Sequence, residues 1–193
     1  MPRLRRFVAL FFDRPAELLP RRKLKRAWLH RHRGQLDAEA IAGDLARRLV
    51  PTSLGLMGLL GSDLYAADLN FVFGVGLFSE RAGVQSLHRY GDGPPLLLRT
   101  MKVASHELGH MLGLRHCVFY RCGMNGSNSL AELDRQPLHL CPVCIAKLQH
   151  ELGFDAVRRY RALGRFYREV GLVAQARFVD ARAGQLAGAR VED

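Results

Sequence analysis

Apolar residues recur along the first half of the chain in patterns that predict strands around one helix. Residues 7–12 (FVALFF) form a short apolar and aromatic run, which predicts a buried strand. Residues 37–50 carry apolar positions at helical spacing and stop before Pro51, which predicts a helix packed on a sheet. Three further strand candidates, separated by Gly, Ser and Asp turn residues, span residues 54–60, 69–77 and 84–87.

The second half of the chain is predicted to be mainly helical. After the GDGPP break at residues 91–95, residues 96–112 contain no breaker apart from Gly109, which predicts one long helix that ends at Gly113. Helical spacing returns in three later segments, the last of them weaker, at residues 145–153, 154–170 and 173–186. Together these patterns predict an α/β fold in which helices back a twisted mixed sheet.

The most informative feature of the composition is the uneven distribution of charge along the chain. The chain of 193 residues is 48% hydrophobic, enough to bury the core of one domain, and its formal net charge is +11. Residues 1–33 hold 11 Lys/Arg and 2 Asp/Glu, a net charge of +9 that leaves +2 for the rest. The segment 21–33, with Leu24 and Trp28 interleaved, offers contacts to phosphate backbones, anionic lipid or an acidic partner. The simpler interpretation is a solvated surface segment.

The richest chemistry lies in the sequence HELGHMLGLRH, which ends at His116. On a helix His106 and His110 are one turn apart, so both imidazoles leave the same face and can bind one Zn²⁺. Glu107 is rotated round the helix and is better placed to contact a metal-bound water than the metal. Gly113 tolerates a positive φ, which lets the chain turn and return His116 to the same metal. Three neutral imidazoles, an open position and a carboxylate describe a hydrolytic zinc site.

The cysteines suggest a second zinc site. All four, with the spacing C-x4-C-x18-C-x2-C, are Cys117, Cys122, Cys141 and Cys144. Four thiolates close a tetrahedron and leave no open position, so such a metal would be structural. Secretory disulfides are the alternative, but FVALFF is too short for the apolar part of a signal peptide and no cleavage site follows. No run approaches about 18 apolar residues, so we expect no membrane span and a reducing, cytoplasmic setting.

The motif H-E-x-x-H-x-x-G-x-x-H is the metzincin signature. With HCVFYRCGM, CPVC and the flanking LYAADLNFVFG and LGFDAVRRYRALGRFY, the chain resembles the archaemetzincin (archaelysin) family over roughly residues 55–172. The basic first 35 residues depart from that family. The resemblance implies a metzincin-like α+β fold, Glu107 as general base and Met124 beneath the site. It implies one catalytic and one structural zinc ion, held respectively by His106, His110 and His116 and by Cys117, Cys122, Cys141 and Cys144.

We therefore expect one monomeric domain over residues 1–193. Residues 1–35 form the basic, partly flexible segment, residues 36–116 the sheet and active-site helix, and residues 117–193 a helical subdomain with the four-cysteine zinc site. The expected function is hydrolysis of peptide or protein substrates by a zinc-bound water that Glu107 activates. Residues 69–75 are a candidate edge strand for an extended peptide. The alternative is a non-catalytic zinc-binding protein whose basic segment binds nucleic acid or an acidic partner.

Overall fold

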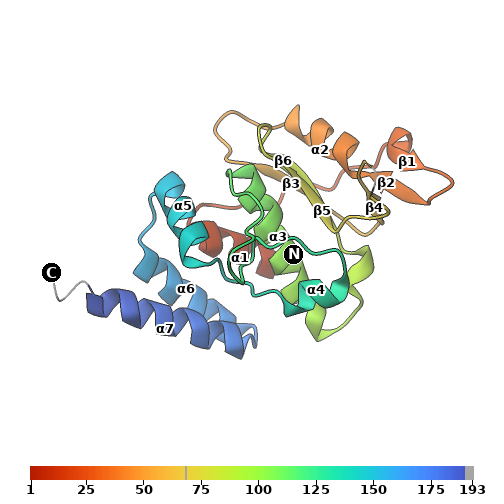
Figure 1. Ribbon diagram of the computed structural model, residues 1–193. Helices are drawn as coiled ribbons and strands as arrows, with labels where there is room; N and C mark the ends of the chain where they lie inside the picture. The colour runs from red at the N-terminus through yellow and green to blue at the C-terminus, as the bar shows by residue number, and fades with distance from the viewer. Residues whose placement is uncertain (68, 190–193) are drawn as a thin grey trace. The chain divides into compact units, whose positions relative to one another are not determined.

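The protein is described here by a computed structural model of residues 1–67 and 69–189, and its chain forms two compact units (Figure 1). One unit contains residues 1–19 and the chain from Ile145 onwards, and is helical. The other contains residues 20–144, and holds every strand of the described chain. The fold is mixed α and β, as the sequence predicts. The single-domain organisation and its three parts stay predictions.

The larger sheet of the 20–144 unit has the strand order β3-β6-β5. Strands β3 (Leu56–Leu60) and β6 (Ala82–Ser86) are parallel, and β5 (Gly74–Leu77) runs antiparallel to β6 at the edge of the sheet. These strands correspond to the three candidates of the sequence pattern, although β5 takes up only the second half of residues 69–77. The predicted mixed sheet is confirmed.

A second, smaller sheet was not predicted. Its order is β1-β2-β4, with β1 (Leu29–His30) antiparallel to β2 (Gln35–Asp37) and β2 parallel to β4 (Leu64–Tyr65). The basic segment therefore supplies β1 and the preceding turn η1 (Arg26–Trp28). Strands of two or three residues are too short to show the two-residue alternation on which sequence reasoning depends.

Two helices cover opposite faces of the β3-β6-β5 sheet (Figure 1). Asp37 caps the N-terminus of helix α2 (Ala38–Ala46), where its carboxylate accepts a hydrogen bond of 2.9 Å from the N–H of Ala40. Val84 of β6 packs with α2 in an apolar cluster. The next residue, Gln85, points to the other face and donates 3.1 Å to the Thr100 carbonyl of α3 (Pro94–Met111). The turn η2 (His88–Tyr90) precedes α3, and the short α4 (Leu130–Arg135) follows it.

The helical unit corrects the prediction for residues 7–12, which form no strand. They are the second half of α1 (Pro2–Phe12), where Leu4, Phe7 and Phe11 are buried at helical spacing. Arg159 donates 2.6 Å to the carbonyl of Phe11 near the end of that helix. A short apolar run is compatible with a buried strand or a buried helix, and periodicity alone does not separate them.

The remaining helices agree with the sequence pattern. They are α5 (Pro142–Leu152), α6 (Ala156–Glu169) and α7 (Val173–Ala189). Asp155 caps the N-terminus of helix α6, where its side chain accepts a 2.7 Å hydrogen bond from the N–H of Arg158. Its buried face includes Leu163 and Phe166, both almost fully buried. Within residues 1–67 and 69–189, no helix has the length and apolar character needed to cross a membrane.

Candidate active site

Helix α3 lies directly on the backbone of strand β5. A Cβ added at Gly76 would lie 2.5 Å from the carbonyl oxygen of Glu107, and one added at Gly74 would lie 2.8 Å from the Glu107 Cγ. Both distances are shorter than any tolerated contact, so only glycine permits this approach. Neither glycine was predicted to belong to the site. Their spacing indicates such a contact, because glycines two residues apart in a strand lie on the same face of the sheet.

The three histidines of the motif come together at the end of α3. Their candidate ligand nitrogens all lie within 4.8 Å of one another. The ring centroids of His106 and His110 are 4.6 Å apart, and that of His116 lies 5.2 and 4.9 Å from these two. His106 and His110 are partly buried, whereas His116 is exposed. The predicted turn at Gly113, with φ of 89°, returns the chain towards the helix.

Hydrogen bonds to carbonyls fix the tautomer of two of these rings. The Nδ1 of His106 lies 2.9 Å from the Gly123 oxygen, and the Nδ1 of His110 lies 2.7 Å from the Leu114 oxygen. A carbonyl can only accept, so each Nδ1 carries the proton in the neutral ring and each Nε2 presents a lone pair. These two Nε2 atoms are 3.0 Å apart. Two facing lone pairs repel unless a cation lies between them.

The geometry fits a zinc ion held by the three imidazoles. Nitrogens at about 2.0–2.1 Å from zinc in a tetrahedron are about 3.3 Å apart, close to the 3.0 Å observed for His106 and His110. Burial and the neighbouring His110 lower the pKa of His106 to about 4, and burial also lowers the pKa of His110. Both rings are therefore neutral near pH 7, which is the form that binds metal.

Glu107 is the one acidic side chain of the motif, and it is buried. Only 7% of the residue is exposed, because it lies under β5. Burial raises the pKa of its carboxyl to about 8, while a hydrogen bond from the backbone N–H of Gly76 opposes that shift. A buried carboxyl of this kind, held by one hydrogen bond beside the histidines, suits a group that takes up and releases a proton in a reaction.

Met124 lies against the same helix between two of the histidines. It is fully buried, and a Cβ added at Gly109 would lie 2.6 Å from its sulfur. Gly109 therefore allows the thioether to touch the backbone of α3. The N–H of Cys117 donates 2.9 Å to the Met124 carbonyl, which ties the two ends of the intervening loop together.

The four cysteines also form one group. Their sulfurs lie within 4.8 Å of one another and all four are free thiols. The Sγ atoms of Cys117 and Cys141 are 3.9 Å apart, far longer than the roughly 2.05 Å of a disulfide. Thiolates at about 2.3 Å from zinc in a tetrahedron are about 3.8 Å apart, so this distance fits a bound zinc ion.

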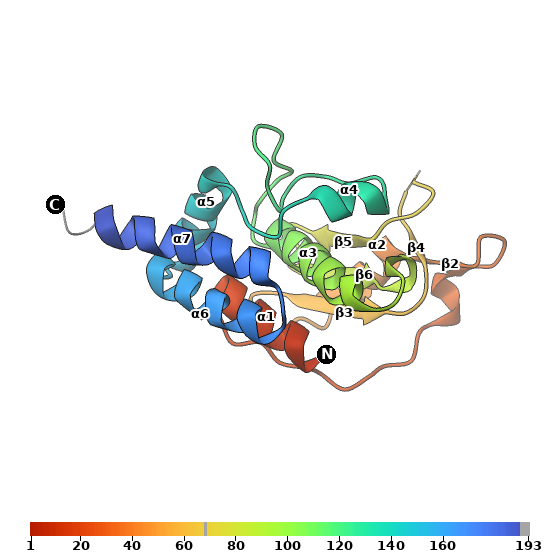
Figure 2. The same ribbon diagram turned by 90° about the horizontal axis from the view of Figure 1, so that it is seen from below.

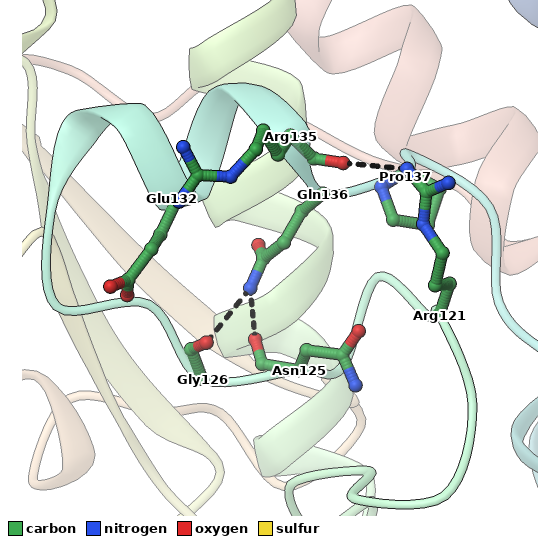
Figure 3. A pocket seen from close by; sticks show the side chains of 7 residues that line it. All are labelled: Arg121, Asn125, Gly126, Glu132, Arg135, Gln136 and Pro137. Atoms are coloured by element: carbon green, nitrogen blue, oxygen red, sulfur yellow. Dashed lines mark hydrogen bonds between the residues drawn. The ribbon is translucent and has the colours of Figure 1, made fainter.

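Asn125 organises the loop that joins the two groups, although nothing in its sequence position identified it. Its side-chain N–H donates 2.5 Å to the Cys117 carbonyl and 2.9 Å to the Tyr120 carbonyl. Its side-chain oxygen accepts a bond of 2.9 Å from the N–H of Cys122. Gln136 in turn donates to the Asn125 carbonyl at 2.5 Å and to the Gly126 carbonyl at 3.1 Å (Figure 3).

An open pocket of about 250 Å³ adjoins this loop (Figure 3). Its lining is mostly polar and consists of Arg121, Asn125, Gly126, Glu132, Arg135, Gln136 and Pro137. A Cβ added at Gly126 would lie 3.4 Å from the ring of His116, so the pocket borders the third histidine. Arg121 closes one side by donating 3.1 Å to the Arg135 carbonyl.

Comparison with known proteins gives archaemetzincins among the relatives of this chain. Residues 13–150 match the model of peptidase family M54. Archaemetzincin-2 of Homo sapiens is 36% identical over 169 residues, which cover 70% of this chain and 47% of that protein. The chain thus spans about half the length of these longer relatives. Archaemetzincin of Methanopyrus kandleri is 38% identical over 161 residues, covering 79% of this chain and 91% of that protein.

Solved structures of that family share the fold. The crystal structure of archaemetzincin from Methanopyrus kandleri superposes with a TM-score of 0.71 at 36% identity, covering 79% of this chain and 86% of that one. The crystal structure of archaemetzincin from Archaeoglobus fulgidus, complexed with malonate, superposes with a TM-score of 0.68 at 30% identity. The match covers 76% of this chain and 90% of that one. The sequence matches and the shared fold agree, and the chain belongs to peptidase family M54, the archaemetzincins.

Proposed function

We propose that the protein is a zinc-dependent metallopeptidase that hydrolyses peptide bonds in peptide or protein substrates. The observation that carries the proposal is the 3.0 Å separation of the Nε2 atoms of His106 and His110, with a third imidazole beside them. Membership of a peptidase family supports it. The buried carboxyl of Glu107 adds the proton acceptor that hydrolysis needs.

In this mechanism His106, His110 and His116 hold the metal, and their neutral rings leave its charge uncompensated. A bound zinc ion supplies a Lewis acid for the substrate carbonyl and lowers the pKa of water. Glu107 accepts the proton of the attacking water and passes it to the leaving amine. The Gly76 N–H holds the carboxylate in place during this exchange. Met124 forms the floor against which α3 packs.

We assign a second, structural zinc ion to Cys117, Cys122, Cys141 and Cys144. Cys117 follows His116 directly, so a metal held by the cysteines restrains the third histidine. Removing that metal should loosen His116 and lower activity even in a protein with Glu107 intact. We also propose a reducing, cytoplasmic setting, in which free thiols persist, and a monomeric protein.

The outer edge of β5 is the proposed site for the substrate backbone. Among the described residues β5 pairs with β6 alone, and we propose that its other edge pairs with an extended peptide. Phe73, in the segment that precedes this strand, is 8% exposed and packs with Tyr90 and Val103, which makes it part of the core.

The decisive experiment compares metal content and hydrolysis in matched variants. We expect wild-type protein to hold two zinc ions per chain and to cleave a peptide library. Glu107→Gln should keep both ions and lose about 10²–10⁴-fold in kcat. Glu39→Gln, which changes an exposed carboxylate of α2, is the control. Near-wild-type turnover by Glu107→Gln would refute the base assignment.

A second candidate function is binding to a polyanion through the basic segment. Five of its cations are exposed and form no ion pair among residues 1–67 and 69–189, namely Arg21, Arg22, Lys23, Arg26 and Arg31. Fluorescence anisotropy with labelled DNA and RNA at 50 and 200 mM salt tests it. Protein that holds two zinc ions, cleaves no peptide and binds nucleic acid with a steep salt dependence would favour this function over hydrolysis.

A further inference from the structure

Three consecutive apolar side chains project into solvent between the third histidine and the second cysteine. We define Val118, Phe119 and Tyr120 as the aromatic tip, and they are 78%, 87% and 54% exposed. Figure 2 shows the chain between α3 and α4 rising as a narrow loop away from α3. We propose that the aromatic tip contacts a bulky apolar residue of the peptide substrate, within about three positions of the scissile bond. This proposal rests on the proposed peptidase function.

The exposure of the tip contrasts with the rest of its loop. Cys122 and Met124, only a few residues further on, are fully buried. The loop could therefore bury apolar side chains, yet it presents these three to water. Exposed Phe and Tyr side chains that stand together are typical of contact surfaces, because they bury a large area at a small cost in side-chain entropy.

The loop is also held rigidly at its base. Asn125 bonds to the carbonyls of Cys117 and Tyr120, and the N–H of Cys117 bonds to the Met124 carbonyl at 2.9 Å. Directly after the tip, Arg121 is anchored 3.1 Å from the Arg135 carbonyl (Figure 3). A surface ordered before binding loses little conformational freedom when a partner docks. The tip is thus suited to contact a ligand at the adjacent metal site.

Chain geometry limits how far the tip can lie from that site. Phe119 is three residues beyond His116, so their Cα atoms are separated by at most about 11 Å. An extended peptide covers a similar distance with about three residues, at about 3.3 Å each. A peptide with its scissile bond at the histidines can therefore place an apolar residue on the tip without leaving an extended conformation.

A lipid surface is the main competing partner. Arg115 and Arg121 flank the tip and are exposed, and cations beside aromatic residues also suit anionic headgroups. The substrate is favoured because the tip starts from a candidate metal ligand and its base is fixed beside that site. Binding to vesicles is consequently one arm of the test.

The test measures kcat/KM for paired peptides that differ by Phe or Ser at each position up to four residues from the cleaved bond. Wild-type protein should favour Phe at one position within three residues of the bond. Phe119→Ser should reduce that Phe/Ser ratio about tenfold, while Phe119→Leu keeps most of it. The control is Val50→Ser, which removes another apolar side chain that is 56% exposed. Zinc content is measured for every variant.

A Phe/Ser ratio that survives in Phe119→Ser would overturn the proposal, as would an equal loss for all peptides. If wild-type protein cleaves no peptide, the proposed peptidase function is refuted, and the role of the tip is then tested by peptide binding. Anisotropy with the same labelled peptides and zinc-loaded protein should then show tighter binding of the Phe peptide, lost in Phe119→Ser. Equal binding of both peptides refutes the contact. Binding to phosphatidylcholine–phosphatidylserine vesicles that depends on Phe119, without peptide preference, assigns the tip to a lipid surface instead.

Discussion

Substituting Gly76 by alanine tests the close approach of α3 to β5. The new Cβ would lie 2.5 Å from the carbonyl oxygen of Glu107 and 3.2 Å from the Cβ of His110. Carbon–oxygen contacts in proteins begin at about 3.3 Å, so helix and strand must separate by about 0.8 Å. Since the obstructing oxygen belongs to the backbone, no side-chain rotation relieves the clash. Overpacking of this kind costs about 1–3 kcal/mol.

In a chain of this length, each kcal/mol lowers Tm by about 2–4 °C, so we expect a fall of about 2–12 °C in calorimetry. Because a displacement near 1 Å at a reacting group costs about 10²-fold, kcat/KM for a peptide should fall about 10- to 100-fold. Gly61→Ala is the control, as a Cβ there meets nothing within 4 Å. A Gly76→Ala protein that matches Gly61→Ala in both Tm and rate would refute this account of the helix–strand contact.

Three further predictions concern stability. Lys102 is 4% exposed and donates hydrogen bonds to two backbone carbonyls of α4 at 2.8 and 2.9 Å. Lys102→Met should therefore lower the free energy of unfolding in urea by about 1–3 kcal/mol. An unchanged midpoint of urea unfolding would contradict this. Hydrogen bonds from Arg48 and Lys25 hold the pKa of Asp44 well below its ordinary value. Because the folded-state pKa is lowered, the ionised carboxylate stabilises the protein fully above the unfolded-state pKa of about 3.9 and progressively less as the pH falls below it. The loss of unfolding free energy in Asp44→Asn relative to wild type should therefore be smaller at pH 3 than at pH 7. A loss that does not change with pH would exclude this linkage. Gly184 lies inside α7 with open space around its Cα, so Gly184→Ala should raise stability by about 0.5–1 kcal/mol in calorimetry; a lower Tm would show a hidden steric conflict.

Several elements were predictable because their signals are local. Helix α3 follows from an uninterrupted run that ends at Gly113, and the structure ends it at Met111. Histidines one turn apart must share a helix face, and the short turn to His116 limits where the third ring can go. The cysteine spacing likewise predicted a group of four thiols, which the fold brings together. The order of β3, β5 and β6 within their sheet was not predictable from their spacing.

Other elements were not predicted correctly, because the pattern of a short segment is compatible with more than one structure. Residues 7–12 were expected to form a strand and form part of α1, since six apolar residues suit either structure once both sides are buried. The strands β1 and β4 have two residues each, too few to show alternation. Their pairing with β2 depends on neighbours that lie up to 28 residues away in the chain.

The residue types and spacing of the motif were enough to predict the chemistry, because ligand identity and helical periodicity belong to the covalent chain. The environment of that chemistry depends on segments distant in sequence. The raised pKa of Glu107 comes from its burial under Gly74 and Gly76, and the neutral state of His106 from burial and the rings around it. The fold of the loop comes from the side chain of Asn125. Desolvation and hydrogen bonding require atoms in contact, and packing between elements is what brings those atoms together.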